Sequence, residues 1–330
     1  MKKTIAVIYG GRSAEHEVSL VSGKSIVEKL NRERFEIREI IIEKNGDWLV
    51  AGNKIPVERA LEEIDIAFPV LHGTYGEDGK IQGLFEMLNI PFVGCGVVES
   101  VLGMDKEFSK IIWRASDIPV VNFVAFKETS WQRNKAAFLK KINQLELPWF
   151  VTPANLGSSV GITKVKSEAD LENAVKFAFE YGEKVLVEES VKNAREIEVS
   201  LLGNKDVEVS ICGEVVPANE FYDYNAKYEN ENSKLFIPAK LETNLMKEIQ
   251  EAAKDAYKTL GLYGYARVDL LLNKETNKFF VSEANTIPGF TAISMFPKLW
   301  AESGLSYTEL LTKLVDFGFE QYNEKSRYKI

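Results

Sequence analysis

The feature that most constrains the fold is an unbroken apolar run near the start of the chain, TIAVIY at residues 4–9, followed at once by Gly10 and Gly11. An apolar run of this length is typical of a strand covered on both faces, as in a parallel sheet. The stretch from the glycines to about Leu30 has the apolar spacing of a helix, and FEIREIII at residues 35–42 predicts another strand. This alternation predicts an open parallel α/β sheet over residues 1–103.

Three more segments belong to this first region. Asn45-Gly46 lies between two apolar segments and predicts a hairpin in which both turn residues take positive φ. IDIAFPVLH at residues 64–72 and PFVGC at residues 91–95 predict two further strands, and a Gly-rich loop between them leads into a helix near 80–89.

The pattern changes after residue 103, so we expect a three-domain chain of α/β and α+β type. Residues 104–190 combine predicted helices and strands as a smaller central α+β domain. Residues 191–330 open with two strands of near-alternating polarity, which favours antiparallel pairing with one face exposed. Within this C-terminal domain, residues 218–237 form a polar, Tyr-rich loop that is either a lid or a surface contact.

Composition excludes several classes of protein. The 41 basic and 49 acidic residues give a formal net charge of −8, which argues against nucleic acid as a partner. No apolar run reaches the roughly 18 residues of a membrane span, and the apolar stretch at the start is too short for a signal peptide. Two cysteines far apart suit a reducing compartment, so we expect a cytoplasmic protein without a membrane partner.

The most informative segment is YARVDLLLNKETNKFFVSEANTIPGF, residues 265–290. Side chains two residues apart on a strand point the same way, so Arg267 shares a direction with Asp269, and Glu283 shares one with Asn285. If the two strands pair through the NKETNK turn, the two carboxylates face each other beside an amide and a guanidinium. This set suits Mg²⁺, although a charged cluster on a half-exposed sheet is an equal alternative.

Two loops could bind anions or substrate. ANLGSSVG at residues 154–161 is either a phosphate clamp or an ordinary hairpin loop. It is not a P-loop, because it lacks the lysine of that motif. Glu15 lies where the first strand leads into a helix, so it either complements the helix dipole or binds a substrate ammonium. His72 follows a buried strand, and the neighbouring Glu77 and Asp78 are expected to be solvated.

Seven segments together resemble the D-alanine–D-alanine ligases of the ATP-grasp superfamily, in order and approximate spacing over essentially the whole chain. They are GGRSAEHEVSL, LHGTYGEDGKIQG, GMDKEFSK, ANLGSSVGI, FYDYNAKY, ARVDLLL and EANTIPGFTAISMFP. The resemblance implies a three-domain ATP-grasp fold with ATP between the central and C-terminal domains. It also implies two Mg²⁺ or Mn²⁺ ions, a homodimer and a cytoplasmic role in peptidoglycan synthesis, and it leaves a requirement for a monovalent cation open.

The resemblance further implies a reaction in two steps. The carboxylate of one D-alanine attacks the γ-phosphate of ATP, and the amine of a second D-alanine then displaces phosphate from the acylphosphate. The first ammonium would be held by Glu15, Ser158 and Tyr228, with His72 nearby. The second carboxylate would be held by Lys227, Ser294 and Met295, and the oxyanion by Arg267 and the backbone at Gly289.

The implied nucleotide site uses two further groups of residues. The metal ligands would be Asp269, Glu283 and Asn285. The groups that contact ATP would be Lys106, Glu188, Glu189, Val191 and Glu196, with the backbone of Glu189 and Val191 reading the base. One residue departs from the family, since Thr152 stands where a lysine usually precedes the proline. We therefore expect a raised KM for ATP with the fold retained.

Lys227 in the Tyr-rich loop resembles ligases that form the dipeptide, which favours D-alanine as the second substrate. Three other functions remain open. They are an ATP-grasp ligase with another acceptor, a nucleotide-binding module without catalysis, and a hydride-transfer enzyme. The last is disfavoured because the chain has no G-x-G-x-x-G after its first strand.

Overall fold

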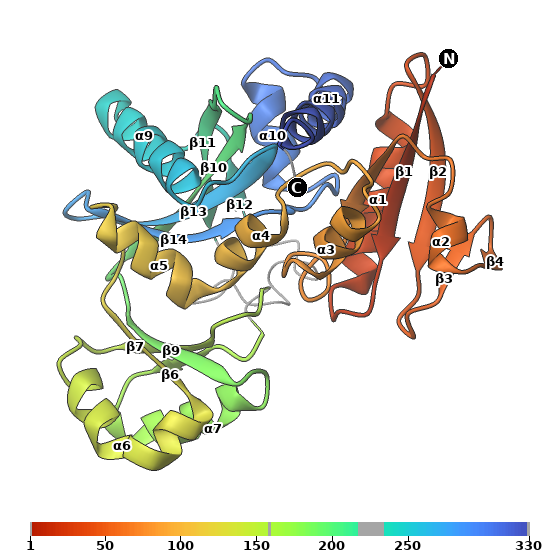
Figure 1. Cartoon of the computed structure of the whole chain (residues 1–330). Helices are drawn as coiled ribbons and strands as arrows, with labels where there is room; N and C mark the ends of the chain where they lie inside the picture. Colours follow the sequence, from red (N-terminus) through yellow and green to blue (C-terminus); the bar gives the residue numbers. More distant parts are fainter. Residues whose placement is uncertain (1, 158–159, 217–233, 329–330) are drawn as a thin grey trace.

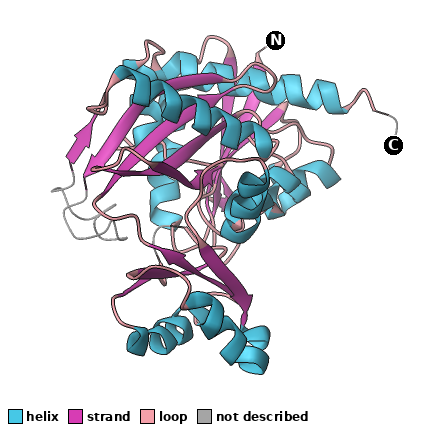
Figure 2. Ribbon diagram, turned by 90° about the vertical axis from the view of Figure 1, so that its left-hand side faces the viewer, coloured by secondary structure: helices cyan, strands magenta, loops and turns pink. Residues whose placement is uncertain are grey.

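The computed structural model describes residues 2–157, 160–216 and 234–328, and its strands form three separate sheets (Figure 1). We call them the N-terminal, central and C-terminal sheets. Figure 2 shows helices packed against the strands throughout, as expected for a mixed α/β chain. No helix in the described part is long and apolar enough to cross a membrane.

The N-terminal sheet has the order β4-β3-β2-β1-β5. Its parallel strands are β1 (Lys3–Gly10), β2 (Phe35–Ile42) and β5 (Ile66–Val70), and its antiparallel edge is formed by β3 (Trp48–Val50) and β4 (Asn53–Lys54). Ile5, Val7 and Tyr9 pack toward α1 (His16–Lys29), while Ala6 and Ile8 pack on the face with α2 (Val57–Ala60) and α3 (Lys80–Met87). The apolar run at residues 4–9 is therefore covered on both faces, as predicted.

Two local predictions in this region were wrong. The hairpin at Asn45-Gly46 forms, but Gly46 alone of the two has positive φ, at +94°. The Gly46 N–H donates to the Glu43 carbonyl at 2.9 Å, so a turn followed by a left-handed glycine replaces the expected two-residue loop. PFVGC makes only an isolated bridge between Phe92 and Ala67, because the chain turns away at Gly94, where φ is +98°.

The central sheet is antiparallel with the order β6-β9-β7-β8. Its strands are β6 (Phe123–Lys127), β9 (Lys184–Glu189), β7 (Trp149–Pro153) and β8 (Thr163–Val165). Helices α6 (Glu128–Ile142) and α7 (Leu171–Phe179) bury one face around Trp149, Val151 and Val187. The opposite face carries the side chains that alternate with these, including Phe150, Thr152 and Glu188.

The C-terminal sheet is antiparallel with the order β12-β11-β10-β13-β14. Its strands are β10 (Ala194–Leu202), β11 (Glu208–Val216), β12 (Lys234–Phe236), β13 (Tyr265–Asn273) and β14 (Phe279–Asn285). Ile197, Val199 and Val268 pack under α9 (Thr243–Thr259), in the core that also holds Trp113 of α5 (Lys106–Ala115). The alternate residues of β10 and β13 therefore point to the other face.

Three more helices complete the described fold. α4 (Val97–Met104), which the sequence pattern did not predict, packs against β14. α10 (Met295–Glu302) packs on β11, and α11 (Tyr307–Lys325) contacts α1 and β5 of the N-terminal region. The two ends of the chain thus share one apolar core.

Candidate active site

A cavity of about 560 Å³ lies between the central and C-terminal sheets. Its walls come from β7, β8 and β9 on one side and from β10, β13 and β14 on the other, with α5 supplying Lys106 and Lys110. Along the paired strands β13 and β14 the lining changes from the charged Asp269 and Glu283 to the apolar Leu271 and Phe280, and Phe150 of β7 also lines the cavity. The cavity therefore runs from an apolar end to a charged end, which suits a ligand with a flat ring system and an anionic tail.

The charged end is built from two rows of side chains across three strands. In the first row Asp269 of β13 pairs with Glu283 of β14 and with Glu198 of β10. In the second row Arg267 pairs with Asn285 on one side and with Ser200 on the other. The predicted pairing of Asp269 with Glu283 is confirmed, and it places carboxylates from three strands side by side.

Arg267 is held between two of these carboxylates. Its Nε lies 2.6 Å from Asp269 Oδ1 and 3.0 Å from Glu198 Oε2, and the Asn285 amide donates to Asp269 Oδ2 at 3.0 Å. Burial lowers the pKa of Arg267, but the charges of Asp269 and Glu198 outweigh it and raise this pKa well above its ordinary value. Arg267 is therefore a fixed cation beside the cavity.

The donors at this end suit Mg²⁺. Asp269 and Glu283 supply carboxylate oxygens and Asn285 an amide oxygen, while water and phosphate usually complete the coordination of this ion. No cluster of three or more His, Cys, Asp or Glu within residues 2–157, 160–216 and 234–328 is arranged to hold a metal by itself.

Two lysines of α5 enter the cavity one helical turn apart. Lys106 Nζ donates to the Leu156 carbonyl at 2.8 Å and lies 3.2 Å from Glu283 Oε2. Lys110 is 2% exposed and lies 2.9 Å from Glu188 Oε1. Lys110 was not among the predicted residues, although its spacing of four from Lys106 places both on one helix face.

The end of β9 and the segment after it line the cavity. The Glu189 side chain is engaged elsewhere, accepting from Asn122 Nδ2 at 3.0 Å and from the Glu146 N–H at 3.1 Å. Val191 and Glu196 line the same wall. The Glu189 N–H also donates to the Asn122 carbonyl at 3.0 Å, so both its carboxylate and its N–H are already engaged.

Glu15 lies where loops from different parts of the chain meet. A β-carbon built on Gly73 would stand 2.4 Å from Glu15 Oε2, and one on Gly157 would stand 3.5 Å from it. Gly73 also has φ of +71°, so a glycine is required there for two reasons. The Glu15 carboxylate thus reaches the loop that follows β7.

His72 connects the N-terminal sheet to the segment after β14. Its Nδ1 lies 3.0 Å from the Ile287 carbonyl, and its Nε2 lies 3.1 Å from Ser22 Oγ. Burial lowers the pKa of His72, against the opposing charge of Glu15, so the ring is neutral at pH 7. A neutral ring donates to the carbonyl through Nδ1–H and accepts from Ser22 at Nε2.

Glu77 corrects an expectation. It is half-buried, and it accepts the Gly73 N–H at 2.9 Å. Burial, together with the charge of Glu15, raises the pKa of Glu77 to about 8. The prediction that this residue is solvated was wrong, because its carboxylate turns inward to the Gly73 N–H of the same loop.

The remaining predicted residues lie near α10 or outside the described part. A β-carbon on Gly289 would meet Ser294 Oγ at 2.7 Å, so these two residues are adjacent. The Met295 side chain is buried against Val215 and Leu299, which leaves its backbone at the start of α10 as the group able to bind a ligand. Ser158, Lys227 and Tyr228 lie outside the described residues, as does most of the 218–237 loop.

Two family descriptions match the chain. "D-ala D-ala ligase N-terminus" matches residues 4–57 and 51–95, and "D-ala D-ala ligase C-terminus" matches residues 112–316. A D-alanine–D-alanine ligase from Thermoanaerobacter sp. (strain X514) is 47% identical, with 99% of each chain covered. D-alanine–D-alanine ligase B of Clostridium tetani is 44% identical, covering 96% of this chain and 94% of its own.

Solved structures of related ligases also match the fold of this chain. The VanG D-Ala:D-Ser ligase from Enterococcus faecalis matches with a TM-score of 0.87 and 36% identity, covering 96% of this chain and 100% of its own. The D-alanine–D-alanine ligase from Coxiella burnetii matches with a TM-score of 0.85 and 33% identity, covering 99% and 98%.

Proposed function

This chain belongs to the family of D-alanine–D-alanine ligases, and from that premise we propose how its residues join two D-alanines for peptidoglycan precursor synthesis. It is an enzyme that uses ATP to ligate D-alanine to D-alanine. The observation that carries the assignment of roles is the cross-strand row of Glu198, Asp269 and Glu283 at the charged end of a cavity with an apolar far end.

ATP lies along the cavity in this proposal. Its base packs between Phe150 and Leu271 and meets the backbone of Glu189 and Val191, while Glu196 accepts hydrogen bonds from the ribose. Glu188, fixed by Lys110, borders the base. The triphosphate then extends toward Lys106, whose contacts with Leu156 and Glu283 already hold its ammonium at the charged end.

Asp269, Glu283 and Asn285 would hold two Mg²⁺ ions, for which Mn²⁺ can substitute. Bound there, the ions neutralise charge on the phosphates during phosphoryl transfer. Arg267 is the neighbouring fixed cation. Its contact with Glu198 keeps the guanidinium oriented when the oxygens of Asp269 turn to other partners.

The first D-alanine is placed beside Glu15, which binds its ammonium together with Ser158 and Tyr228. Its carboxylate oxygen attacks the γ-phosphorus, the bond to the β-phosphate oxygen breaks, and ADP leaves. His72 supports this pocket as a neutral ring, because its two nitrogens contact Ser22 of α1 and the Ile287 carbonyl after β14.

The second D-alanine is placed at the N-terminus of α10, where unpaired N–H groups of a helix favour a carboxylate. Ser294, the backbone of Met295 and Lys227 bind it. Its neutral amine attacks the acyl carbon, and the resulting oxyanion is stabilised by Arg267 and the backbone at Gly289. Phosphate leaves, and the amine proton is released as the peptide bond forms.

We also propose the larger organisation implied by the family. The domains are residues 1–103, 104–190 and 191–330, with the 218–237 loop as a lid that excludes water from the acylphosphate. The working enzyme is a cytoplasmic homodimer. D-Alanine is the second substrate, supported by the names of the relatives at 44–47% identity, and D-serine is the competing acceptor because of the VanG structure.

Phosphate release from ATP tests this function. The purified protein should release phosphate only with D-alanine and Mg²⁺ present, and mass spectrometry should identify D-alanyl-D-alanine as the product. L-Alanine serving equally well would overturn the assignment. If D-alanyl-D-serine is the main product at equal concentrations of D-alanine and D-serine, D-serine is the preferred second substrate.

A further inference from the structure

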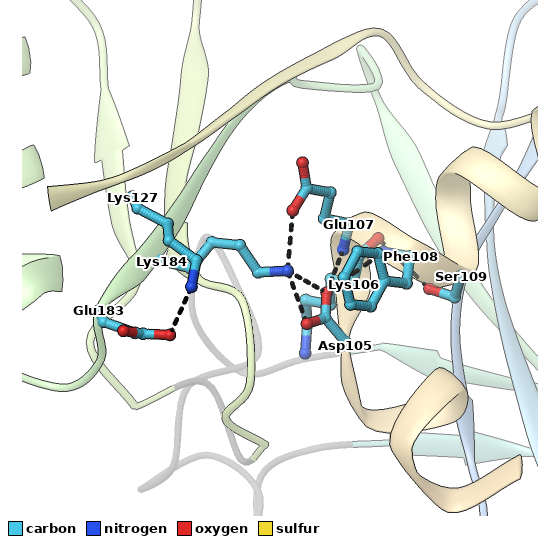
Figure 3. A network of polar contacts seen from close by, with 8 residues as sticks. All are labelled: Asp105, Lys106, Glu107, Phe108, Ser109, Lys127, Glu183 and Lys184. Atoms are coloured by element: carbon cyan, nitrogen blue, oxygen red, sulfur yellow. Dashed lines mark hydrogen bonds and ion pairs between the residues drawn. The ribbon is translucent and has the colours of Figure 1, made fainter. Parts of the chain in front are cut away.

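A buried ion-pair cluster lies just outside the nucleotide cavity, at the start of α5 (Figure 3). Lys184, the first residue of β9, lies 2.8 and 2.6 Å from the two carboxylate oxygens of Asp105 and 2.7 Å from Glu107 Oε2. Its ammonium also stands 4.0 Å from the centre of the Phe108 ring. The three N–H donors of the Lys184 ammonium thus meet three carboxylate oxygens, so its hydrogen-bonding capacity is fully satisfied.

The same carboxylate caps α5. Asp105 Oδ1 accepts the N–H groups of Glu107 and Phe108 at 3.1 and 3.2 Å, which fixes the first turn of the helix. Lys106, the first helical residue, lies between the capping residue and these donors. The position of Asp105 therefore sets where the Lys106 side chain begins.

Backbone hydrogen bonds join this turn to the central sheet. The Ala154 N–H donates to the Lys184 carbonyl at 2.9 Å, and the Lys106 N–H donates to the Ala154 carbonyl at 3.0 Å. Lys106 Nζ then reaches the Leu156 carbonyl at 2.8 Å. Lys184, Ala154 and Lys106 thus form one continuous connection from β9 to the charged end of the cavity.

This connection crosses between two layers of the molecule. β9 belongs to the central sheet, while α5 packs against α9 and β14 beside the C-terminal sheet. Apart from Lys184, the cluster brings only negative charge from Asp105 and Glu107, next to the place where a triphosphate would lie. An uncharged residue at 184 would leave the buried Asp105 and the half-buried Glu107 without their cation.

We propose that Lys184 is a positioning residue for ATP: through Asp105 it fixes the start of α5 and so aims Lys106 at the phosphates. This inference rests on the proposed placement of ATP. Lys184 does not line the cavity, and in this proposal it acts only through Lys106 at the phosphates. Its loss should therefore weaken the binding of ATP far more than the binding of adenosine.

The test compares binding of ATP and of adenosine, by isothermal titration with Mg²⁺ present, in the full-length protein. Lys184→Met should weaken ATP binding about tenfold, the loss of one charged hydrogen bond at the phosphates, and leave adenosine binding within about twofold. The matched control is Lys127→Met. Lys127 forms the neighbouring ion pair with Glu183 at 2.9 Å, but the two side chains are 57% and 78% exposed, so both affinities should be unchanged.

Two further variants keep the test decisive. Asp105→Asn retains a side-chain acceptor for the helix cap and should show the same selective loss, so it replaces Lys184→Met if that protein does not fold. Lys184→Arg should restore most of the ATP affinity, because a guanidinium can bind both carboxylates. Equal weakening of ATP and adenosine, or no weakening of either, would overturn the positioning role.

Lys106→Met separates this inference from the proposed function. If Lys106→Met binds ATP as tightly as the unaltered protein, the proposed phosphate contact of Lys106 is wrong, and the positioning role falls with it. If Lys106→Met loses affinity while Lys184→Met and Asp105→Asn do not, the phosphate contact stands and only the positioning role fails.

Discussion

Thr152→Lys should lower the KM for ATP by placing a cation in the cavity that we propose binds the nucleotide. Thr152 is 4% exposed and lines that cavity on the strand face it shares with Phe150. A hydrogen bond between charged groups contributes about 1.5–3 kcal/mol, or about 10- to 140-fold in affinity. Repulsion from Lys106 and Lys110, which line the same cavity, opposes part of this gain. We therefore expect KM to fall about tenfold, which corresponds to about 1.4 kcal/mol.

The assay is D-alanine-dependent phosphate release as a function of ATP concentration, at saturating D-alanine. Thr129→Lys is the matched control, because Thr129 is exposed on α6, away from the cavity, and the added charge is the same. Without nucleotide, Thr152→Lys should melt at a lower temperature than the control, since its new lysine is buried near two others. A folded Thr152→Lys protein with an unchanged or higher KM for ATP would refute the reasoning.

Three further predictions follow from the site. Asp269→Asn or Glu283→Gln should lower kcat at least about a hundredfold and raise the Mg²⁺ concentration needed for phosphate release, since each removes a proposed metal ligand; a variant with an unchanged Mg²⁺ titration would contradict this role. Glu198→Gln should lower kcat about tenfold with KM for ATP nearly unchanged, because it loosens Arg267; steady-state kinetics showing the reverse pattern would exclude it. Because burial lowers the pKa of His72, the unfolded chain binds a proton that the folded chain does not, so stability should fall as pH drops below about 6.5. His72→Gln should reduce the slope of melting temperature against pH between pH 7 and 5, and an unchanged slope would assign it to other groups.

Much of the charged end of the site could be predicted from strand period alone. Arg267 and Asp269, like Glu283 and Asn285, are two residues apart on strands joined by a short turn, so local pairing brings them together. Glu198 could not be found in this way. β10 and β13 pair although more than sixty residues separate them along the chain, and no local pattern indicates which distant strands are neighbours.

Other features of the structure that the sequence did not predict depend on contacts between distant segments or on the choice among similar turns. Lys184 lies near Asp105 because two sheets and a helix meet there, and the sequence around either residue carries no sign of the other. α11 packs against β5, which is more than two hundred residues earlier, and no local pattern indicates that contact. The turn at Gly46 differed because several hairpin loops accept an Asn-Gly pair, and only one fits the twist and register of β2 and β3.

The measurement that tests the central claim most directly is a crystal structure with a non-hydrolysable ATP analogue and Mn²⁺, which can be located by its anomalous scattering. We expect the base against Phe150 and Leu271, the terminal phosphate within reach of Lys106, and metal density between Asp269 and Glu283. An analogue bound elsewhere, or bound in this cavity with no metal at those two carboxylates, would contradict the account.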